Sequence, residues 1–127
     1  MLTFAQFLKK HNLKNKSTSN IEINKVNPNV EVVTKSQLIN QSEGKTFIVN
    51  LDDKKGTHWA LLIDGFYFDP FGVSPPREVK CDLYSTYQIQ KVNESYCAAY
   101  CLYVVYLVDC GLTFKQAVLN LYFQRIK

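Results

Sequence analysis

Hydrophobic and polar positions follow the clearest pattern in the middle of the chain. Two runs of aromatic, aliphatic and β-branched residues, His58–Ile63 and Phe66–Asp69, are separated only by Asp64-Gly65. A two-residue Asp-Gly connection favours a tight β-hairpin, because both turn positions need a positive φ. We therefore predict an antiparallel hairpin at these positions.

Three further segments have the composition of β-strands. Thr46–Leu51 is a short apolar run, and Leu83–Gln90 is rich in residues that favour strands. Residues 21–40 are ambiguous, although Val30–Thr34 within them favours a strand. The polar segment 52–56 is expected to form a loop before the hairpin. We therefore expect a small, antiparallel-rich sheet centred on the hairpin.

Helical signals lie at the two ends of the chain. Thr3 and Gln6 have the spacing of a capping box and predict a short helix at the N-terminus. In the C-terminal part, Ser95 is expected to cap a helix that carries no charge until its last turn. A helix that is apolar on all sides is buried on all sides. Gly111 is expected to end it, and a last helix begins at Thr113.

The overall composition is that of a folded protein. The chain has 127 residues, of which 46% are hydrophobic and 20% are charged. These values predict one domain spanning residues 1–127, with its core motifs at about 46–111. The longest apolar run, Tyr96–Val108, is shorter than the roughly 20 residues that cross a bilayer. The N-terminus lacks the pattern of a signal peptide, so we expect a soluble, intracellular protein that is neither secreted nor bound to a membrane.

The charge is unevenly distributed. The net charge is +4, and residues 1–50 account for the whole excess, with seven lysines against three glutamates. A basic N-terminal half can contact DNA or another polyanion. Because the excess is small, a solvated lysine-bearing surface is the simpler interpretation.

The four cysteines are Cys81, Cys97, Cys101 and Cys110. Without a secretory signal, free thiols are expected rather than disulfides. No CxxC pair is present, and the CxxxC pair lies in an apolar stretch, so no metal site is expected. Cys101 and Cys110 are predicted to be inert thiols in the core.

The register of the predicted hairpin brings a histidine and an aspartate together. If Asp64-Gly65 form the turn, His58 and Asp69 are diagonal neighbours on one face of the sheet. A carboxylate that orients an imidazole is the base half of a nucleophilic triad. The alternative is a structural aspartate that precedes a proline at the end of a strand. The other histidine, His11, lies in a polar segment and is expected at the surface.

Cys97 is the candidate nucleophile, since it would lie in the first turn of the buried helix. Unpaired N–H groups and the helix dipole favour a thiolate there, and a nearby imidazolium would favour it further. Gln90 lies seven residues earlier and can complete an oxyanion hole with the Cys97 N–H. The alternative for Gln90 is a solvated side chain at the end of a strand.

Three short motifs occur in the order found in a known protease family: THWALL, FDPFG and QKVNESYCAAYC. With them the chain resembles the adenovirus-type maturation proteases, the adenain family, which share a clan with the SUMO-specific proteases. The resemblance covers about Phe47 to Gly111, roughly half of the chain. It implies a Cys-His-Asp triad with a glutamine donor, in which His58 is the general base, Asp69 its orienter, Gln90 the oxyanion donor and Cys97 the nucleophile.

The resemblance also implies substrates, activators and a setting. The family processes viral structural precursor polypeptides, within the virion or in the host cytoplasm or nucleus. The sequence itself requires no cofactor, but some family members are activated by DNA and by a peptide that pairs with a cysteine. Cys81 is the candidate for that activator contact, with a plain structural thiol as the alternative. Trp59 is expected to support the substrate or the core, and Ala98 stands where the family usually has glycine.

We therefore predict an α+β domain whose small antiparallel-rich sheet packs on a buried central helix carrying the nucleophile at its N-terminus. The predicted function is a cysteine endopeptidase that processes viral or virus-like structural precursors. Three alternatives stay open: a protease that removes ubiquitin-like modifiers, a catalytically silent binding module with the protease fold, and an accessory protein that binds polyanions through its basic N-terminal half.

Overall fold

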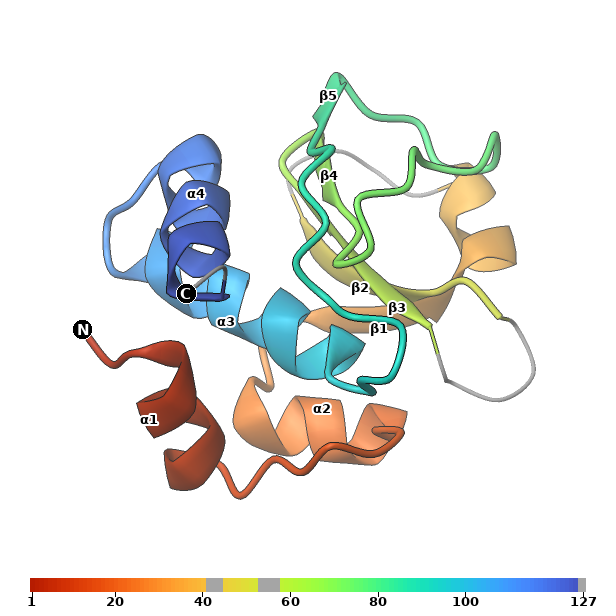
Figure 1. Cartoon of the computed structure of the whole chain (residues 1–127). Helices are drawn as coiled ribbons and strands as arrows, with labels where there is room; N and C mark the ends of the chain where they lie inside the picture. The colour runs from red at the N-terminus through yellow and green to blue at the C-terminus, as the bar shows by residue number, and fades with distance from the viewer. Residues whose placement is uncertain (41–44, 53–57, 126–127) are drawn as a thin grey trace.

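A computed structural model describes residues 1–40, 45–52 and 58–125 of the chain. In this described part the fold is α+β, with a five-stranded mixed sheet and four α-helices. In Figure 1, α1, α3 and α4 lie on the left and the strands of the sheet lie on the right. The loop predicted at 52–56 falls almost entirely outside the described residues.

The sheet has the strand order β1-β2-β3-β4-β5. Its strands are β1 (Glu31–Thr34), β2 (Thr46–Asn50), β3 (Trp59–Ile63), β4 (Phe66–Phe68) and β5 (Leu83–Tyr84). The two central pairings, β2 with β3 and β3 with β4, are antiparallel. The two edge pairings, β1 with β2 and β4 with β5, are parallel. The expected antiparallel-rich sheet is therefore mixed. A parallel pair needs a crossover connection, which the 3-10 helix η1 (Lys35–Asn40) supplies between β1 and β2.

The predicted hairpin is confirmed with its register. Asp64 and Gly65 form the turn with φ of 49° and 82°. Leu61 pairs with Phe68, and Ile63 pairs with Phe66. The left-handed conformation at both turn positions matches the right-handed twist of the two strands.

The predicted strand at 83–90 is much shorter in the structure. Only Leu83–Tyr84 pairs with β4, and Ser85 adds one bond from its N–H to the carbonyl of Tyr67. Beyond this point the chain turns away from the sheet. The N–H groups of Ile89 and Gln90 instead donate to the carbonyl of Pro70. The carbonyl of Pro70, just after β4, therefore accepts the backbone bonds that the seventh and eighth residues of the predicted strand would have used.

The N-terminal helix α1 (Phe4–Lys10) begins with the predicted capping box between Thr3 and Gln6. A second helix, α2 (Asn20–Val26), was not predicted. Its signal is present in the sequence, because Ser19 and Glu22 form another capping box at its start. The helix is only 7 residues long, so its apolar periodicity is weak.

The central helix α3 (Cys97–Asp109) is buried on nearly all sides, as its composition predicted. Ten of its 13 residues are buried, and it packs against β3, α1, α2 and α4 (Phe114–Arg125). Gly111, with a φ of 108°, follows its C-terminal end as expected. Within the described residues, no helix is long and apolar enough to span a bilayer.

The start of α3 differs from the expectation. Tyr96, not Ser95, is the N-cap residue, and its side chain makes no capping hydrogen bond. The backbone N–H of Ser95 donates instead to Asn15 Oδ1 at 2.6 Å. Cys97 is consequently the first residue of the helix.

Candidate active site

His58 and Asp69 are in contact at one end of the hairpin. The Nε2 atom of His58 lies 3.1 Å from Asp69 Oδ2 and 3.2 Å from Oδ1. The carboxylate is 1% exposed, whereas the imidazole is 33% exposed. The predicted contact between these two side chains is therefore present, with the imidazole at the edge of the solvent and the carboxylate buried.

A tight turn after β4 fixes the carboxylate. The N–H of Phe71 donates to Asp69 Oδ1 at 2.8 Å, and the N–H of Gly72 donates to the Asp69 carbonyl at 2.8 Å. Gly72 has a φ of 74°, and the backbone of Thr86 to Gln88 passes so close that a Cβ atom would lie 2.8–3.0 Å from it. The turn therefore positions the Asp69 carboxylate independently of its contact with the imidazole.

Cys97 contacts the backbone of Trp59, the residue that follows His58. The N–H of Trp59, the residue after His58, donates to Cys97 Sγ at 3.4 Å. One turn further along α3, the Cys101 thiol donates to the Trp59 carbonyl at 3.7 Å. The first turns of α3 therefore pack against the backbone at the start of β3, which brings Cys97 next to the residue that bears the imidazole.

The thiol of Cys97 is buried at the first residue of the helix. Its residue is 3% exposed, and burial raises the pKa of the Cys97 thiol. Hydrogen bonds from the backbone N–H groups of Trp59 and Ala98 lower this pKa, whereas the negative charge of Asp69 raises it further. The penalty for burying a charge thus outweighs the hydrogen bonds that favour the thiolate.

Gln90 is buried rather than solvated, with 2% exposure. Its Nε2 donates to the Glu94 carbonyl at 2.7 Å, and its backbone N–H donates to the Pro70 carbonyl at 2.8 Å. The buried Oε1 has no hydrogen-bond partner within the described part of the chain. The bond to Pro70 ties Gln90 to the turn that holds Asp69.

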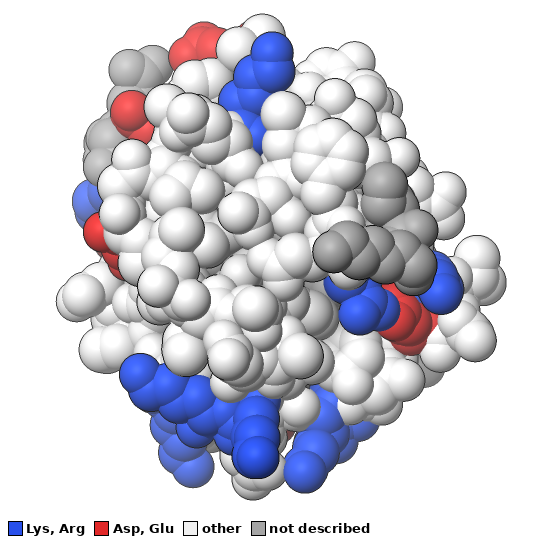
Figure 2. Space-filling model, turned by 60° about the vertical axis from the view of Figure 1, so that its left-hand side comes forward, with Lys and Arg blue, Asp and Glu red and all other residues white. Residues whose placement is uncertain are grey.

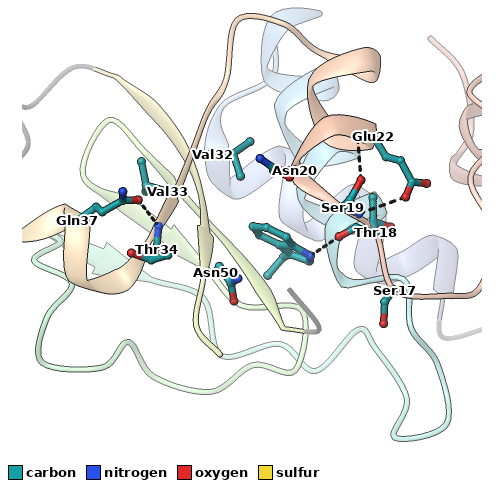
Figure 3. Close-up of a pocket in the computed structure, with 11 residues that line it drawn as sticks. Ser17, Thr18, Ser19, Asn20, Glu22, Val32, Val33, Thr34, Gln37 and Asn50 are labelled. Atoms are coloured by element: carbon teal, nitrogen blue, oxygen red, sulfur yellow. Dashed lines mark hydrogen bonds between the residues drawn. The ribbon is translucent and has the colours of Figure 1, made fainter. Parts of the chain in front are cut away.

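Trp59 supports the core and also borders a cavity (Figure 3). Its indole N–H donates to the Thr18 carbonyl at 3.0 Å. The cavity has a volume of about 550 Å³ and is lined largely by hydroxyl and amide groups, among them those of Thr34 and Asn50 at the ends of β1 and β2. Among the described residues that line it, Glu22 is the only ionisable one. Such a surface suits a polar or backbone hydrogen-bonding partner.

The other cysteines differ in their surroundings. Cys101 is fully buried, and burial raises its pKa well above the usual value. Cys81 is partly buried, and burial followed by the charge of Asp82 raises its pKa. Cys110 is exposed, so its assignment to the core was wrong. It occupies the C-cap of α3, just beyond the buried part of the helix.

The remaining expectations concern His11 and metal binding. His11 ends α1 at the C-cap and is partly buried, with its ring 4.6 Å from that of Phe7. Among the described residues, no group of three or more His, Cys, Asp or Glu side chains is placed to hold a metal ion.

The structure adds two site-adjacent residues that the sequence did not suggest. Glu94 lies in the loop between Gln90 and Cys97, and Arg125 of α4 forms an ion pair with it at 2.6 Å. The two residues are 31 positions apart, and no local pattern marks such a pair.

Comparisons with protein-family models, curated protein sequences and solved structures returned no match.

Proposed function

We propose that this protein is a cysteine endopeptidase whose nucleophile stands at the N-terminus of the central helix. The observation that carries the proposal is the juxtaposition of the His58–Asp69 contact with the hydrogen bond from Trp59 to Cys97 Sγ. A base, its orienting carboxylate and a thiol come from three separate stretches of chain. Their meeting at one end of the sheet supports nucleophilic catalysis better than three independent structural roles.

The proposed reaction begins with proton transfer from Cys97 to His58. Asp69 holds the Nε2 side of the imidazole, which leaves Nδ1 to take the proton from the thiol. The thiolate attacks the scissile carbonyl, and His58 then protonates the leaving amine, giving an acyl-enzyme. Water, deprotonated by His58, cleaves the thioester, and the proton returns to the thiol.

Two donors are assigned to the oxyanion. One is the backbone N–H of Cys97, the first residue of α3, where the N–H groups of the first turn point toward the end of the helix. The other is the Gln90 side-chain NH2, which has a second hydrogen beyond the one given to Glu94. Both would stabilise the negative charge that develops on the substrate carbonyl.

The substrates proposed are structural precursor polypeptides of a virus or virus-like element, on the basis of the family resemblance. The cavity beside Trp59 has hydroxyl and amide groups that can bond to an extended peptide backbone, and none of the four proposed catalytic residues lines it (Figure 3).

A basic surface supports a polyanionic partner such as DNA. Lys9, Lys10, Lys14 and Lys16 are all exposed in α1 and the segment that follows it. Figure 2 shows Lys and Arg side chains gathered along the lower edge of a face that is otherwise largely uncharged. Binding to duplex DNA that weakens steeply as the salt concentration rises would support this partner.

One observation favours a second candidate, a catalytically silent module with the same fold. Cys97 is 3% exposed and burial raises its pKa, and Ala98 follows it where the resembling family usually has glycine. A thiol in this state reacts slowly unless the imidazole takes its proton. The reactivity of Cys97 therefore separates the two candidates.

The test uses three forms of the full chain: wild type, Cys97→Ala and Cys101→Ala. Cys101 is the matched control, since it lies one turn away in the same helix and is also buried. Each form is incubated with a peptide library and with fusions to ubiquitin-like modifiers, and new termini are identified by mass spectrometry. We expect cleavage by wild type and Cys101→Ala and none by Cys97→Ala. Equal cleavage by all three would remove Cys97 from the mechanism, and inert wild-type protein would favour the silent module.

A further inference from the structure

An ion pair joins α4 to the loop between Gln90 and Cys97. Arg125 Nη2 lies 2.6 Å from Glu94 Oε2, and the guanidinium group stands 5.7 Å from the ring centres of both Phe4 and Tyr100. The Glu94 side chain is only 13% exposed. Solvent therefore screens this pair less than an ordinary surface pair.

The same carboxylate organises the loop. Glu94 Oε1 accepts the Tyr100 hydroxyl at 2.9 Å and the Lys91 N–H at 3.1 Å. In return the Glu94 N–H donates to the Lys91 carbonyl at 3.0 Å. Residues 91–94 are thus closed into a turn whose side-chain anchor is bound by Arg125.

The Gln90 side chain takes its orientation from this turn. Its Nε2 donates to the Glu94 carbonyl at 2.7 Å, and its Oε1 finds no partner among the described residues. The direction of the second N–H hydrogen is therefore set by where the backbone of Glu94 lies.

We propose that Arg125 is a positioning residue for Gln90, acting through Glu94. In this arrangement the C-terminal helix holds the loop, the loop holds the amide, and the amide is presented to the oxyanion. The inference rests on the proposed peptidase function for its catalytic meaning, but the structural coupling from Arg125 to Gln90 can be measured without any activity.

The first test is a nuclear magnetic resonance measurement of the Gln90 side-chain NH2 in the full-length protein. The variants are Arg125→Gln, Arg125→Lys and Glu94→Gln, with Lys115→Gln as the control because Lys115 is an exposed cation on the same helix. We expect the Gln90 signal to move in Arg125→Gln and Glu94→Gln, to move less in Arg125→Lys, and to stay in place in Lys115→Gln. An unmoved Gln90 signal in folded Glu94→Gln would overturn the proposal, even if Arg125→Gln fails to fold.

The second test is kinetic and uses the peptide identified for the wild-type enzyme. We expect Arg125→Gln to lower kcat about tenfold with little change in KM, less than the 10²–10³-fold typical of losing an oxyanion donor. In a Gln90→Ala background the same change should have no further effect. An equal loss in both backgrounds would overturn the proposal. Absence of peptidase activity with the expected movement of the Gln90 signal would instead contradict the proposed function and leave the positioning role standing.

Discussion

The backbone N–H of Trp59 donates a hydrogen bond to Cys97 Sγ across 3.4 Å, although the two residues are 38 positions apart. This bond links the start of β3 to the first residue of α3. Because His58 precedes Trp59 and contacts Asp69, the same bond brings the thiol next to the backbone that follows His58. The chemistry proposed for the protein depends on this one packing contact between a strand and a helix.

Asp69→Asn tests the orienting role of the buried carboxylate. The amide keeps an oxygen for the Phe71 N–H but loses the charge that stabilises an imidazolium. We expect kcat/KM for the identified peptide to fall at least about 100-fold, the lower range for general acid–base catalysis. Asp64→Asn is the control, because Asp64 is exposed in the hairpin turn and asparagine tolerates its positive φ. Wild-type activity in Asp69→Asn would assign Asp69 a structural role.

Gly72→Ala tests the close approach between the Asp69 turn and the segment that leads to Gln90. A Cβ atom at Gly72 would meet the carbonyl oxygen of Thr86 at 2.8 Å. We expect the free energy of unfolding to fall by about 2 kcal/mol or more, from the left-handed backbone and the overpacking together. Gly111→Ala is the comparison, because a Cβ there would meet no atom within 4 Å and only the backbone cost applies. Denaturant unfolding of both variants decides, and equal losses would contradict the steric argument.

Tyr67→Phe should stabilise the protein at neutral pH. The Tyr67 residue is 0% exposed, and its buried hydroxyl has no hydrogen-bond partner in the described part of the chain. Leaving such a group unsatisfied costs about 1–3 kcal/mol, so its removal should raise the free energy of unfolding by about 1 kcal/mol. Urea unfolding at pH 7 measures the change, with Tyr84→Phe as an exposed control. A less stable Tyr67→Phe variant would show that the hydroxyl is satisfied in solution.

The same variant carries a prediction about alkaline pH. Burial, then the charge of Asp69, raises the pKa of Tyr67 far above its usual value of 10.0. Above pH 10 the unfolded chain therefore loses this proton while the folded protein keeps it, so stability falls as the pH rises. Tyr67→Phe should lose less stability than wild type between pH 9 and pH 11, on the order of 1 kcal/mol per pH unit at most. Parallel pH profiles of the two proteins would contradict the assignment.

The cysteines should react with a disulfide reagent in a definite order. Cys110 is exposed and Cys101 is fully buried. We expect Cys110 to react first in the native protein and Cys101 only after unfolding, because attack needs an accessible thiolate. Cys110→Ser should remove the fastest phase seen with Ellman's reagent. Persistence of that phase would mean that another thiol is more accessible than its burial indicates.

The hairpin shows how far local sequence reaches. Asp64-Gly65 specify both the turn and the register, and the register brings the segments that carry His58 and Asp69 to the same end of the hairpin. The burial of α3 can also be predicted from its own residues, because a helix with apolar residues on every face is stable only when every face is packed against protein. The short helix α2 has a capping box at Ser19 and Glu22 but too few residues for a clear apolar periodicity.

The burial and hydrogen bonding of the candidate site residues do not follow from their neighbours along the chain. The position of Cys97 at a helix N-terminus indicated an activated thiol, but packing against β3 buries it and raises its pKa. Gln90 is predicted at the end of a strand, yet its backbone N–H donates to the Pro70 carbonyl and its side-chain Nε2 donates to the Glu94 carbonyl. Each outcome depends on which distant segment arrives beside the residue.

The sequence by itself thus determined the elements that turn chemistry and periodicity encode within a few residues: the hairpin, its register, the capped first helix and the buried central helix. Only the tertiary structure decided the parallel edges of the sheet, the depth of the Cys97 thiol and the link from Arg125 through Glu94 to Gln90. The reason is physical. Backbone conformation follows from neighbours along the chain, whereas burial, charge pairing and hydrogen-bond partners follow from neighbours in space.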